Sequence, residues 1–217
     1  MAAPNYTIAP VLESDLPFLA NFLHVAKLSL SINRLIFKDW PNDAVQMQMY
    51  TGAVRGGFSD PSMESFKAVD SDSDEIIGYF ALARKQPVEE TSVDAENKDS
   101  NQVIPDGLNP GLFEEVVKAT DQISKKVEAM DRFELVYMCV KPSCQRNGIG
   151  SKLVQLGFDR AKAEGIPLAV CAEAPAYGFF VKLGFKDTTH CDMDIRRYAP
   201  ANSGFGIFRL SGMIWRP

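Results

Sequence analysis

A glycine-bearing turn between a predicted strand and a predicted helix most constrains what this chain can fold into and bind. The turn reads Gln145-Arg146-Asn147-Gly148-Ile149-Gly150. Glycine lets backbone N–H groups approach a ligand without an intervening Cβ atom, and the first N–H groups of the following helix have no partners within it. The positive end of the helix dipole favours an anion there, and Arg146 adds charge. The turn therefore predicts a pyrophosphate site.

The residues after this turn exclude two other nucleotide-binding motifs. A dinucleotide fingerprint needs a third glycine three positions on, where this chain has Leu153. A P-loop needs Gly-Lys followed by Ser or Thr, and Gly150 is followed by Ser151 and Lys152.

Hydrophobic periodicity predicts strands and helices throughout the chain. Strands are expected at 6–10, 65–69, 76–83, 134–140, 167–171, 185–190 and 205–215. The second and third should form an antiparallel hairpin through the polar turn 70–74. The pattern predicts a mixed α/β sheet with helices on both faces.

Turn and cap residues indicate where the helices begin and end. Ser14 or Asp15 can cap a first helix that has Pro17 in its first turn. Its stripe is apolar except for the last member, Lys27. A second helix is expected after 41–43 and should end at Gly56-Gly57. Later helices are expected at 148–164, which Gly165 should end, and at 175–183.

The remaining segments predict one domain over residues 1–217. Residues 86–109 lack a period and are rich in Asp, Glu, Ser and Asn, so we expect a mobile surface loop inserted within that domain. An inserted helix at about 110–130 should follow, with one face marked by Leu112, Val116, Ala119, Ile123, Val127 and Met130.

Composition limits the partners and the setting. The net charge of −5 argues against nucleic acid, which needs a basic face. No apolar run approaches the ~20 residues that span a membrane. The cysteines form no CxxC pair, and no histidine lies at metal-finger spacing, so we expect no metal and a reducing, cytoplasmic setting. They are Cys139, Cys144, Cys171 and Cys191.

Two motifs at typical separation resemble the GNAT superfamily of N-acetyltransferases. The run 140–150 resembles its motif A, Q/R-x-x-G-x-G/A after a strand. The run 179–185, Phe-Phe-Val-Lys-Leu-Gly-Phe, resembles motif B, commonly L-Y-x-K-L-G-F. Residues 33–37 and 76–79 also resemble a fungal small-molecule branch, so the resemblance covers most of the chain.

The resemblance implies a GNAT-like fold: a mostly antiparallel sheet of about seven strands with a splayed parallel pair and helices on both faces. It implies transfer of an acetyl group from acetyl-CoA to the amine of a small molecule, by direct attack in a ternary complex. It places the co-substrate against Met138, Cys139, Val140, Gln145, Arg146, Asn147, Gly148, Ile149, Gly150, Ser151 and Phe180.

The reaction needs a base, because an ordinary amine is mostly protonated at neutral pH. Strand alternation would put Glu134 on the face of Val136, Met138 and Val140, where apolar neighbours raise a carboxyl pKa. Residues 134–137 also resemble the histone acetyltransferase branch, where a glutamate at this place is the base. Glu173, at the end of the next strand, is the rival candidate, and Glu134 can also simply begin its strand in solvent.

The acid is where the chain departs from the family. Motif B usually has a tyrosine where this chain has Phe180, which has no proton to donate. Tyr177 lies three residues earlier, would share that helix face, and can either replace the tyrosine or only pack.

Two alternatives therefore stay open beside a small-molecule enzyme. One is a protein or peptide N-acetyltransferase, and the other is a GNAT-like protein that binds CoA with impaired catalysis. The superfamily implies a monomer or a homodimer.

Overall fold

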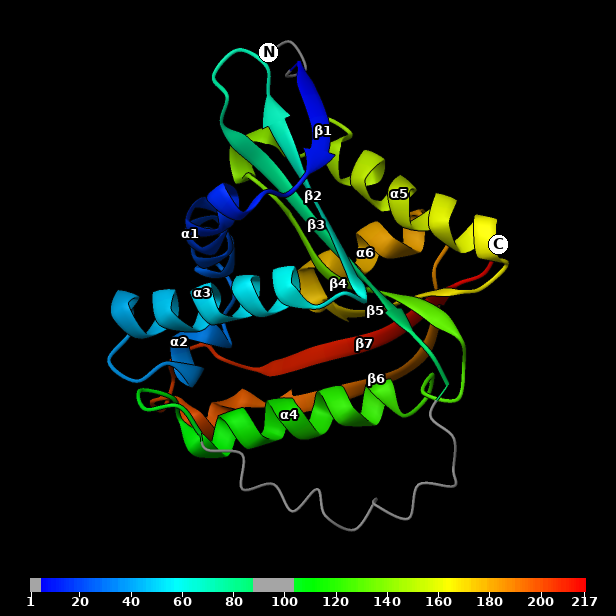
Figure 1. The fold of residues 1–217 in the computed structure, drawn as a ribbon. Helices are drawn as coiled ribbons and strands as arrows, with labels where there is room; N and C mark the ends of the chain where they lie inside the picture. Colours follow the sequence, from blue (N-terminus) through cyan, green and yellow to red (C-terminus); the bar gives the residue numbers. More distant parts are fainter. Residues whose placement is uncertain (1–4, 88–103) are drawn as a thin grey trace.

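The computed structural model describes residues 5–87 and 104–217, whose strands form one seven-stranded sheet (Figure 1). The sheet order is β1-β2-β3-β4-β5-β7-β6. Every neighbouring pair is antiparallel except β4 with β5, which is parallel. The strands are β1 (Tyr6–Pro10), β2 (Met63–Asp70), β3 (Ile76–Lys85), β4 (Arg132–Val140), β5 (Leu168–Glu173), β6 (Lys186–Asp194) and β7 (Ile207–Trp215). The predicted fold class and the β2–β3 hairpin are confirmed.

Six α-helices accompany the sheet within the described ranges. They are α1 (Leu16–Lys27), α2 (Asn33–Ile36), α3 (Asp43–Ser59), α4 (Pro110–Ser124), α5 (Ile149–Glu164) and α6 (Ala174–Lys182). The sequence patterns found all of them except the four-residue α2. Gly165 ends α5 in the left-handed conformation, at φ 67°, as predicted.

Three expectations about helix ends are wrong. α3 continues past Gly56-Gly57 to Ser59, and Gly57 instead admits the Met63 side chain, which would lie 3.3 Å from a Cβ at that position. α4 ends at Ser124 rather than near residue 130. In the turns that follow, hydrogen bonds such as Val127 N–H to Ser124 C=O span three residues instead of the four of an α-helix.

The third concerns the start of α1. Asp15 precedes the helix, but a 3₁₀ turn leads into it and gives Asp15 a helical backbone (φ −83°, ψ −19°). Its carboxylate therefore does not cap α1; it accepts from Leu12 N–H at 2.7 Å and pairs with Lys67 at 2.6 Å.

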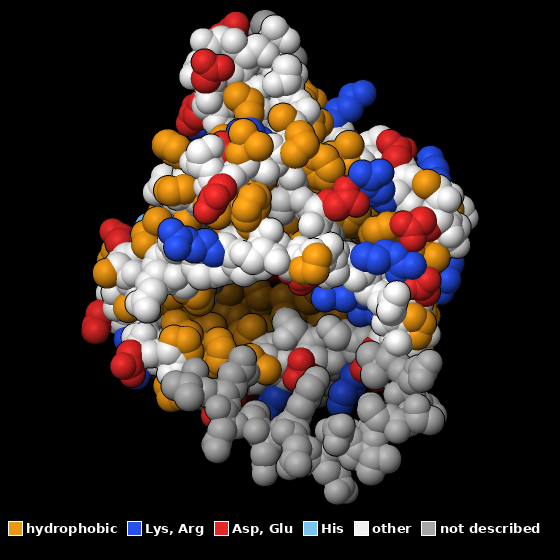
Figure 2. Space-filling view, in the orientation of Figure 1, with side chains coloured by type: hydrophobic (Ala, Val, Ile, Leu, Met, Phe, Trp, Pro, Cys, Tyr) orange, Lys and Arg blue, Asp and Glu red, His pale blue; other side chains and the backbone are white. Residues whose placement is uncertain are grey.

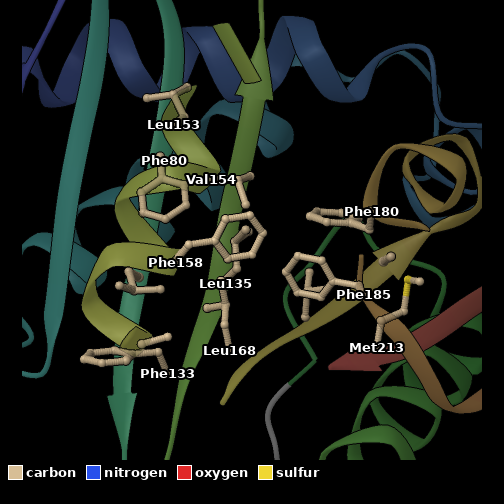
Figure 3. Close-up of a cluster of buried hydrophobic side chains, with 14 of the residues drawn as sticks. Phe80, Phe133, Leu135, Leu153, Val154, Phe158, Leu168, Phe180, Phe185 and Met213 are labelled. Atoms are coloured by element: carbon tan, nitrogen blue, oxygen red, sulfur yellow. The ribbon is translucent and has the colours of Figure 1, made fainter. Parts of the chain in front are cut away.

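Alternate side chains of β3 contribute to the hydrophobic cores on the two faces of the sheet. Phe80 and Leu82 pack with α5 and α6, and Tyr79 and Ala81 pack with α1 and α3. In the first cluster Phe180 and Phe185 meet edge to face, with ring centroids 5.2 Å apart (Figure 3). The helices therefore cover both faces, as predicted.

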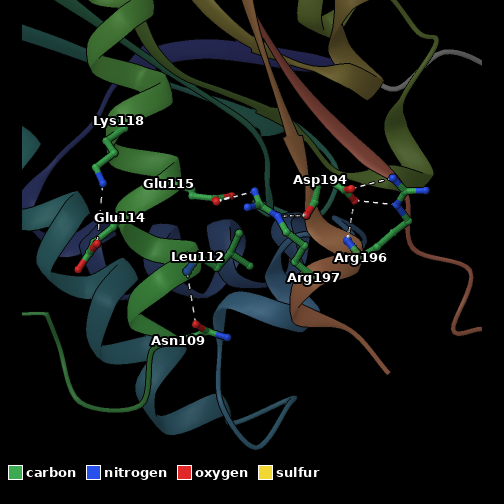
Figure 4. A network of polar contacts seen from close by, with 8 residues as sticks. All are labelled: Asn109, Leu112, Glu114, Glu115, Lys118, Asp194, Arg196 and Arg197. Carbon is green, nitrogen blue, oxygen red and sulfur yellow. Dashed lines mark hydrogen bonds and ion pairs between the residues drawn. The ribbon is translucent and has the colours of Figure 1, made fainter. Parts of the chain in front are cut away.

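α4 is tied down at its beginning and along its side (Figure 4). The Asn109 side chain accepts from Leu112 N–H at 3.4 Å, which caps the helix. The Glu115 carboxylate accepts from Arg197 at 2.6 Å, which joins α4 to the segment after β6. The second contact holds α4 beside that segment, while α4 packs against β6 and β7.

The predicted loop at 86–109 lies mostly outside the described residues. Its last part packs beside α2, where Asn109 N–H donates to Ile36 C=O at 2.7 Å and Leu108 bridges to Phe37. Across 5–87 and 104–217, no helix combines the length and the apolar character that crossing a bilayer requires.

Candidate active site

The parallel strands β4 and β5 pair over only three residue pairs, the last being Leu135 with Val170. The next residue of β4, Val136, forms a β-bulge. Two consecutive residues of β3, Leu82 and Ala81, pair with Leu135 and Tyr137, so Val136 between them has no partner on β3. Beyond this point β4 stays paired with β3, but its edge toward β5 is open. Two adjoining clefts lie along this open edge.

The loop cleft, named for the turn at 145–150, has a volume of about 690 Å³. Nine of the eleven residues expected to contact the co-substrate line it: Met138, Cys139, Val140, Gln145, Arg146, Gly148, Ile149, Gly150 and Ser151. Asn147 does not line it, and its side chain donates to Cys144 C=O at 3.2 Å to brace the turn. Phe180 does not line it either.

The turn has the geometry expected of an anion site. Gly148 has φ +80° immediately before α5, and a Cβ there would meet nothing within 4 Å. The Gln145 side chain donates to Val140 C=O at 3.1 Å and ties the turn to β4. The start of α5 and the exposed Arg146 thus face the loop cleft, and these groups fit a pyrophosphate.

The inner cleft, with a volume of about 290 Å³, continues from the loop cleft toward α2, α4 and β7. Its walls are mostly apolar, with Ile32 and Ile36 beside α2, Val116 from α4, and Phe208 and Leu210 from β7. Figure 2 shows a hollow below α3 whose visible surface is mostly hydrophobic. The charged residues that line the inner cleft, within the described part of the chain, are Lys27 and Glu173.

Five of the described residues line both clefts, and Lys27 and Glu173 are the charged pair among them. Lys27 Nζ lies 2.6 Å from Glu173 Oε1, and their side chains are 23% and 31% exposed. Burial alone would lower the pKa of Lys27, but the charge and hydrogen bond of Glu173 outweigh it and raise that pKa. The Lys27 ammonium therefore lies against the Glu173 side chain where the clefts meet.

Cys139 also lines both clefts, and its chemistry is limited by burial. Burial raises the pKa of the Cys139 thiol to about 11, against the opposing charge of Lys27. A thiol must ionise to act as a nucleophile, so Cys139 is poorly suited to carry an acyl group near neutral pH.

The structure does not bring Glu134 to this junction. The Val136 bulge reverses the alternation of β4: Phe133 and Leu135 pack on the α5 face, and so do Met138 and Val140. The expectation that Glu134 shares a face with Met138 and Val140 is therefore wrong.

Glu134 instead accepts from Arg132 Nη2 at 3.1 Å. It lines a separate cavity of about 20 Å³ beside Thr188 and Gly212. This position does not favour its predicted role as the base, whereas Glu173, the rival, lies at the junction of the clefts.

Tyr177 is not at the junction either. Its hydroxyl donates to Asp187 Oδ2 at 2.9 Å, and it lines neither cleft. Phe180, 3% exposed, packs in the core and lines the inner cleft. The position of Tyr177 therefore does not favour its predicted role as the acid.

Sequence reasoning missed the pairing of Lys27 with Glu173, which are 146 positions apart. The available signal was a lysine at the end of an otherwise apolar helix stripe. Such a residue is buried only with a partner.

No group of three or more His, Cys, Asp or Glu residues in 5–87 and 104–217 is placed to hold a metal ion. All four cysteines are free.

Comparison with known proteins identifies the domain. Residues 114–187 match the family model described as the acetyltransferase (GNAT) domain. No curated protein sequence matches the chain significantly. The matched residues run from α4 to the start of β6, so they include the turn and Glu173 but not Lys27.

Solved structures share the fold at low identity. A putative arylalkylamine N-acetyltransferase 7 from the yellow fever mosquito superposes with a TM-score of 0.64 at 15% identity, covering 97% of this chain and 87% of that one. The structure described as histone acetyltransferase HPA2 and related acetyltransferase from Corynebacterium glutamicum has a TM-score of 0.57 at 19% identity, covering 100% of this chain and 97% of that one. Arabidopsis thaliana NAA60, in complex with a bisubstrate analogue, has a TM-score of 0.54 at 14% identity, covering 98% of each chain.

The domain match and the fold agree with the motifs at 140–150 and 179–185. Residues 114–187 therefore carry a match to the acetyltransferase (GNAT) domain, and the chain as a whole has the fold of GNAT acetyltransferases.

Proposed function

We propose that the chain acetylates the primary amine of a small hydrophobic molecule, by direct attack on acetyl-CoA in a ternary complex. The observation that carries this proposal is the meeting of an anion-binding cleft and an apolar cleft at one carboxylate, Glu173. The nitrogen forms a bond to the acetyl carbon, and the bonding electrons of the C–S bond leave with sulfur. An acceptor that begins as an ammonium ion loses two protons in all. One is matched by the proton that the CoA thiolate takes up, and the other is released to solvent.

The loop cleft suits the acyl donor. Its volume of about 690 Å³ lies within the ~300–1,000 Å³ range of ligand sites. The phosphates would lie at Gly148 and the start of α5, and the arm would run along the open edge of β4 at Met138 to Val140. That edge offers backbone groups to an extended ligand as a neighbouring strand would.

Glu173 is the base in this proposal. It faces both clefts, with Lys27 beside it, and its carboxylate is placed to accept a proton from the acceptor amine. Lys27 also disfavours a second cation nearby, so an acceptor that enters as the neutral amine is favoured.

The inner cleft suits a hydrophobic monoamine. Its apolar walls from α2, α4 and β7 bind hydrocarbon, and its one carboxylate is paired. A polyamine would bring further ammonium groups, which need carboxylates that the described lining does not offer. The mosquito protein of similar fold is named for arylalkylamines, which agrees with this class.

A panel of acceptors tests the proposal. We expect acetylation of 2-phenylethylamine with kcat/KM at least ~10-fold above that of spermidine and of a peptide with a free N-terminus, since each buried CH₂ is worth about 0.8 kcal/mol. Thiol release with each acceptor measures the rates. Preference for the peptide would support a peptide N-acetyltransferase. CoA binding without transfer to any amine would support an impaired GNAT-like protein.

Direct attack also predicts the behaviour of Cys139. Since its thiol pKa is about 11, a Cys139→Ser variant should keep kcat within ~3-fold of wild type, the scatter typical of a near-neutral change. Mass spectrometry after incubation with acetyl-CoA alone should detect no acetyl group on Cys139. A stable acetyl-cysteine at this position, or ping-pong kinetics, would contradict direct attack.

A cytoplasmic location and a monomeric or homodimeric state stay predictions.

A further inference from the structure

The position that supplies a proton donor in related motifs is apolar here. Phe180 packs its ring 5.2 Å from those of Phe179 and Phe185. The Tyr177 hydroxyl is held by Asp187 outside both clefts. The sulfur that leaves during transfer therefore has no tyrosine from α6 beside it. Of the described residues that line both clefts, Lys27 carries the positive charge.

Lys27 is held firmly at this place. Its Nζ lies 2.6 Å from Glu173, and its carbonyl oxygen accepts from the Asn33 side chain at 2.9 Å. Asn33 also donates to the Tyr50 hydroxyl at 3.2 Å. Because Lys27 is the last residue of α1, the negative end of the helix dipole further stabilises its charge.

A cation of this kind can stabilise a thiolate but is a poor proton donor to it. The pKa of Lys27 is raised above its usual 10.5, whereas a thiol ordinarily titrates near ~8.5. Proton transfer from Lys27 to sulfur would therefore be uphill. The attraction between the ammonium and the developing negative charge needs no transfer, and it is stronger at a partly buried site than in water.

We propose that Lys27 is the cation that stabilises the departing thiolate, in place of a tyrosine proton donor. This inference rests on the proposed function. As the C–S bond breaks, its electron pair goes to sulfur, and Lys27 pairs with that charge while keeping its own proton. The thiolate later takes a proton from solvent.

The thiol pKa of bound CoA tests this without turnover. An opposite charge within ~4–6 Å lowers a pKa by about 1–3. In wild type we expect the pKa of the bound CoA thiol to lie below that of free CoA by this amount. The ultraviolet absorbance of the thiolate, recorded against pH, measures it. Complexes with desulfo-CoA give the background. In Lys27→Met the pKa should return to that of free CoA or above, and in Lys27→Arg it should stay low.

Other groups around Lys27 do not obscure this titration. Those that face it are Glu173, Cys139 and Tyr137, with Tyr50 joined through Asn33. Burial raises the pKa of Cys139 to about 11 and raises those of Tyr137 and Tyr50, so these groups remain neutral where the CoA thiol titrates.

Kinetics give the second readout. Lys27→Met should lower kcat by about 10²-fold, as loss of one electrostatic stabiliser does, with little change in the affinity for desulfo-CoA. Lys27→Arg should retain most of the rate, because a guanidinium keeps the charge. If Lys27→Met lowers the unfolding midpoint, the Lys27→Met/Glu173→Gln double variant removes the unpaired carboxylate, and the thiol pKa is measured in it.

Two outcomes separate this inference from the proposed function. A bound thiol pKa that is equal in wild type and Lys27→Met would overturn the role of Lys27 and leave the acetyltransferase intact. Failure of the wild type to bind CoA would instead contradict the proposed function.

Discussion

Glu173→Gln should lower kcat for acetyl transfer by about 10²–10⁴-fold, the usual effect of removing a general base. Glutamine keeps the size and a hydrogen-bond acceptor for Lys27 but cannot accept a proton. CoA binding should persist, because the turn at 145–150 is unchanged. Thiol release under saturating substrates measures kcat, and calorimetry measures CoA affinity.

Glu134→Gln is the matched control, since it is the same substitution on the neighbouring strand. The amide still accepts from Arg132, and position 134 lines neither cleft, so kcat should remain within ~3-fold of wild type. If Glu134→Gln lost activity and Glu173→Gln kept it, the base would be Glu134, as residues 134–137 suggest. Unfolding midpoints of both variants establish that the fold is intact.

Gly150→Leu should weaken CoA binding by at least ~100-fold, or about 2.7 kcal/mol. A Cβ at this position in α5 would lie 3.4 Å from the Phe179 ring and 3.7 Å from Met138, and both residues line the loop cleft. A leucine would therefore extend into the space that the donor needs. Calorimetric titration with CoA measures the loss.

Gly178→Leu provides the comparison for this variant. Gly178 also lies within a helix, α6, but it lines neither cleft, and a Cβ there would meet nothing within 4 Å. Both changes improve helix propensity, but Gly178→Leu should leave CoA affinity within ~3-fold of wild type. Equal affinity in the two variants would show that CoA does not pass Gly150.

The sequence predicted what depends on neighbouring residues. The turn at 145–150 needs only a strand, two glycines and a helix start, so nine of the residues expected around it line one cleft. The hairpin of β2 and β3 and the glycine end of α5 are likewise set by local turn chemistry.

The errors arose where distant contacts decide. The bulge at Val136 follows from the register between β3 and β4, and it reversed the face expected for Glu134. α3 passes two glycines because its surroundings supply packing that propensity does not include. The pair of Lys27 and Glu173 forms only when the last residue of α1 comes beside the last residue of β5, which no local pattern specifies.

The family match also divides the chain in an informative way. Residues 114–187 contain the turn, β4, β5 and α6, which form most of the donor side. The acceptor side combines residues of the matched range, from α4, β4, β5 and α6, with others outside it, from the end of α1, from α2 and the residue before it, and from β7. The part of the inner cleft that lies outside the domain match therefore has to be interpreted from its own lining residues.

The open edge of β4 has a consequence for solubility. An unpaired strand edge on a protein surface recruits strands from other molecules and promotes aggregation. Here the edge lies in the middle of the sheet, and the loop cleft over it is lined by the end of α1 on one side and by α6 on the other. A thin, flexible arm can reach these backbone groups, but another folded chain cannot. The protein thereby keeps an edge available for recognition without presenting it to its neighbours.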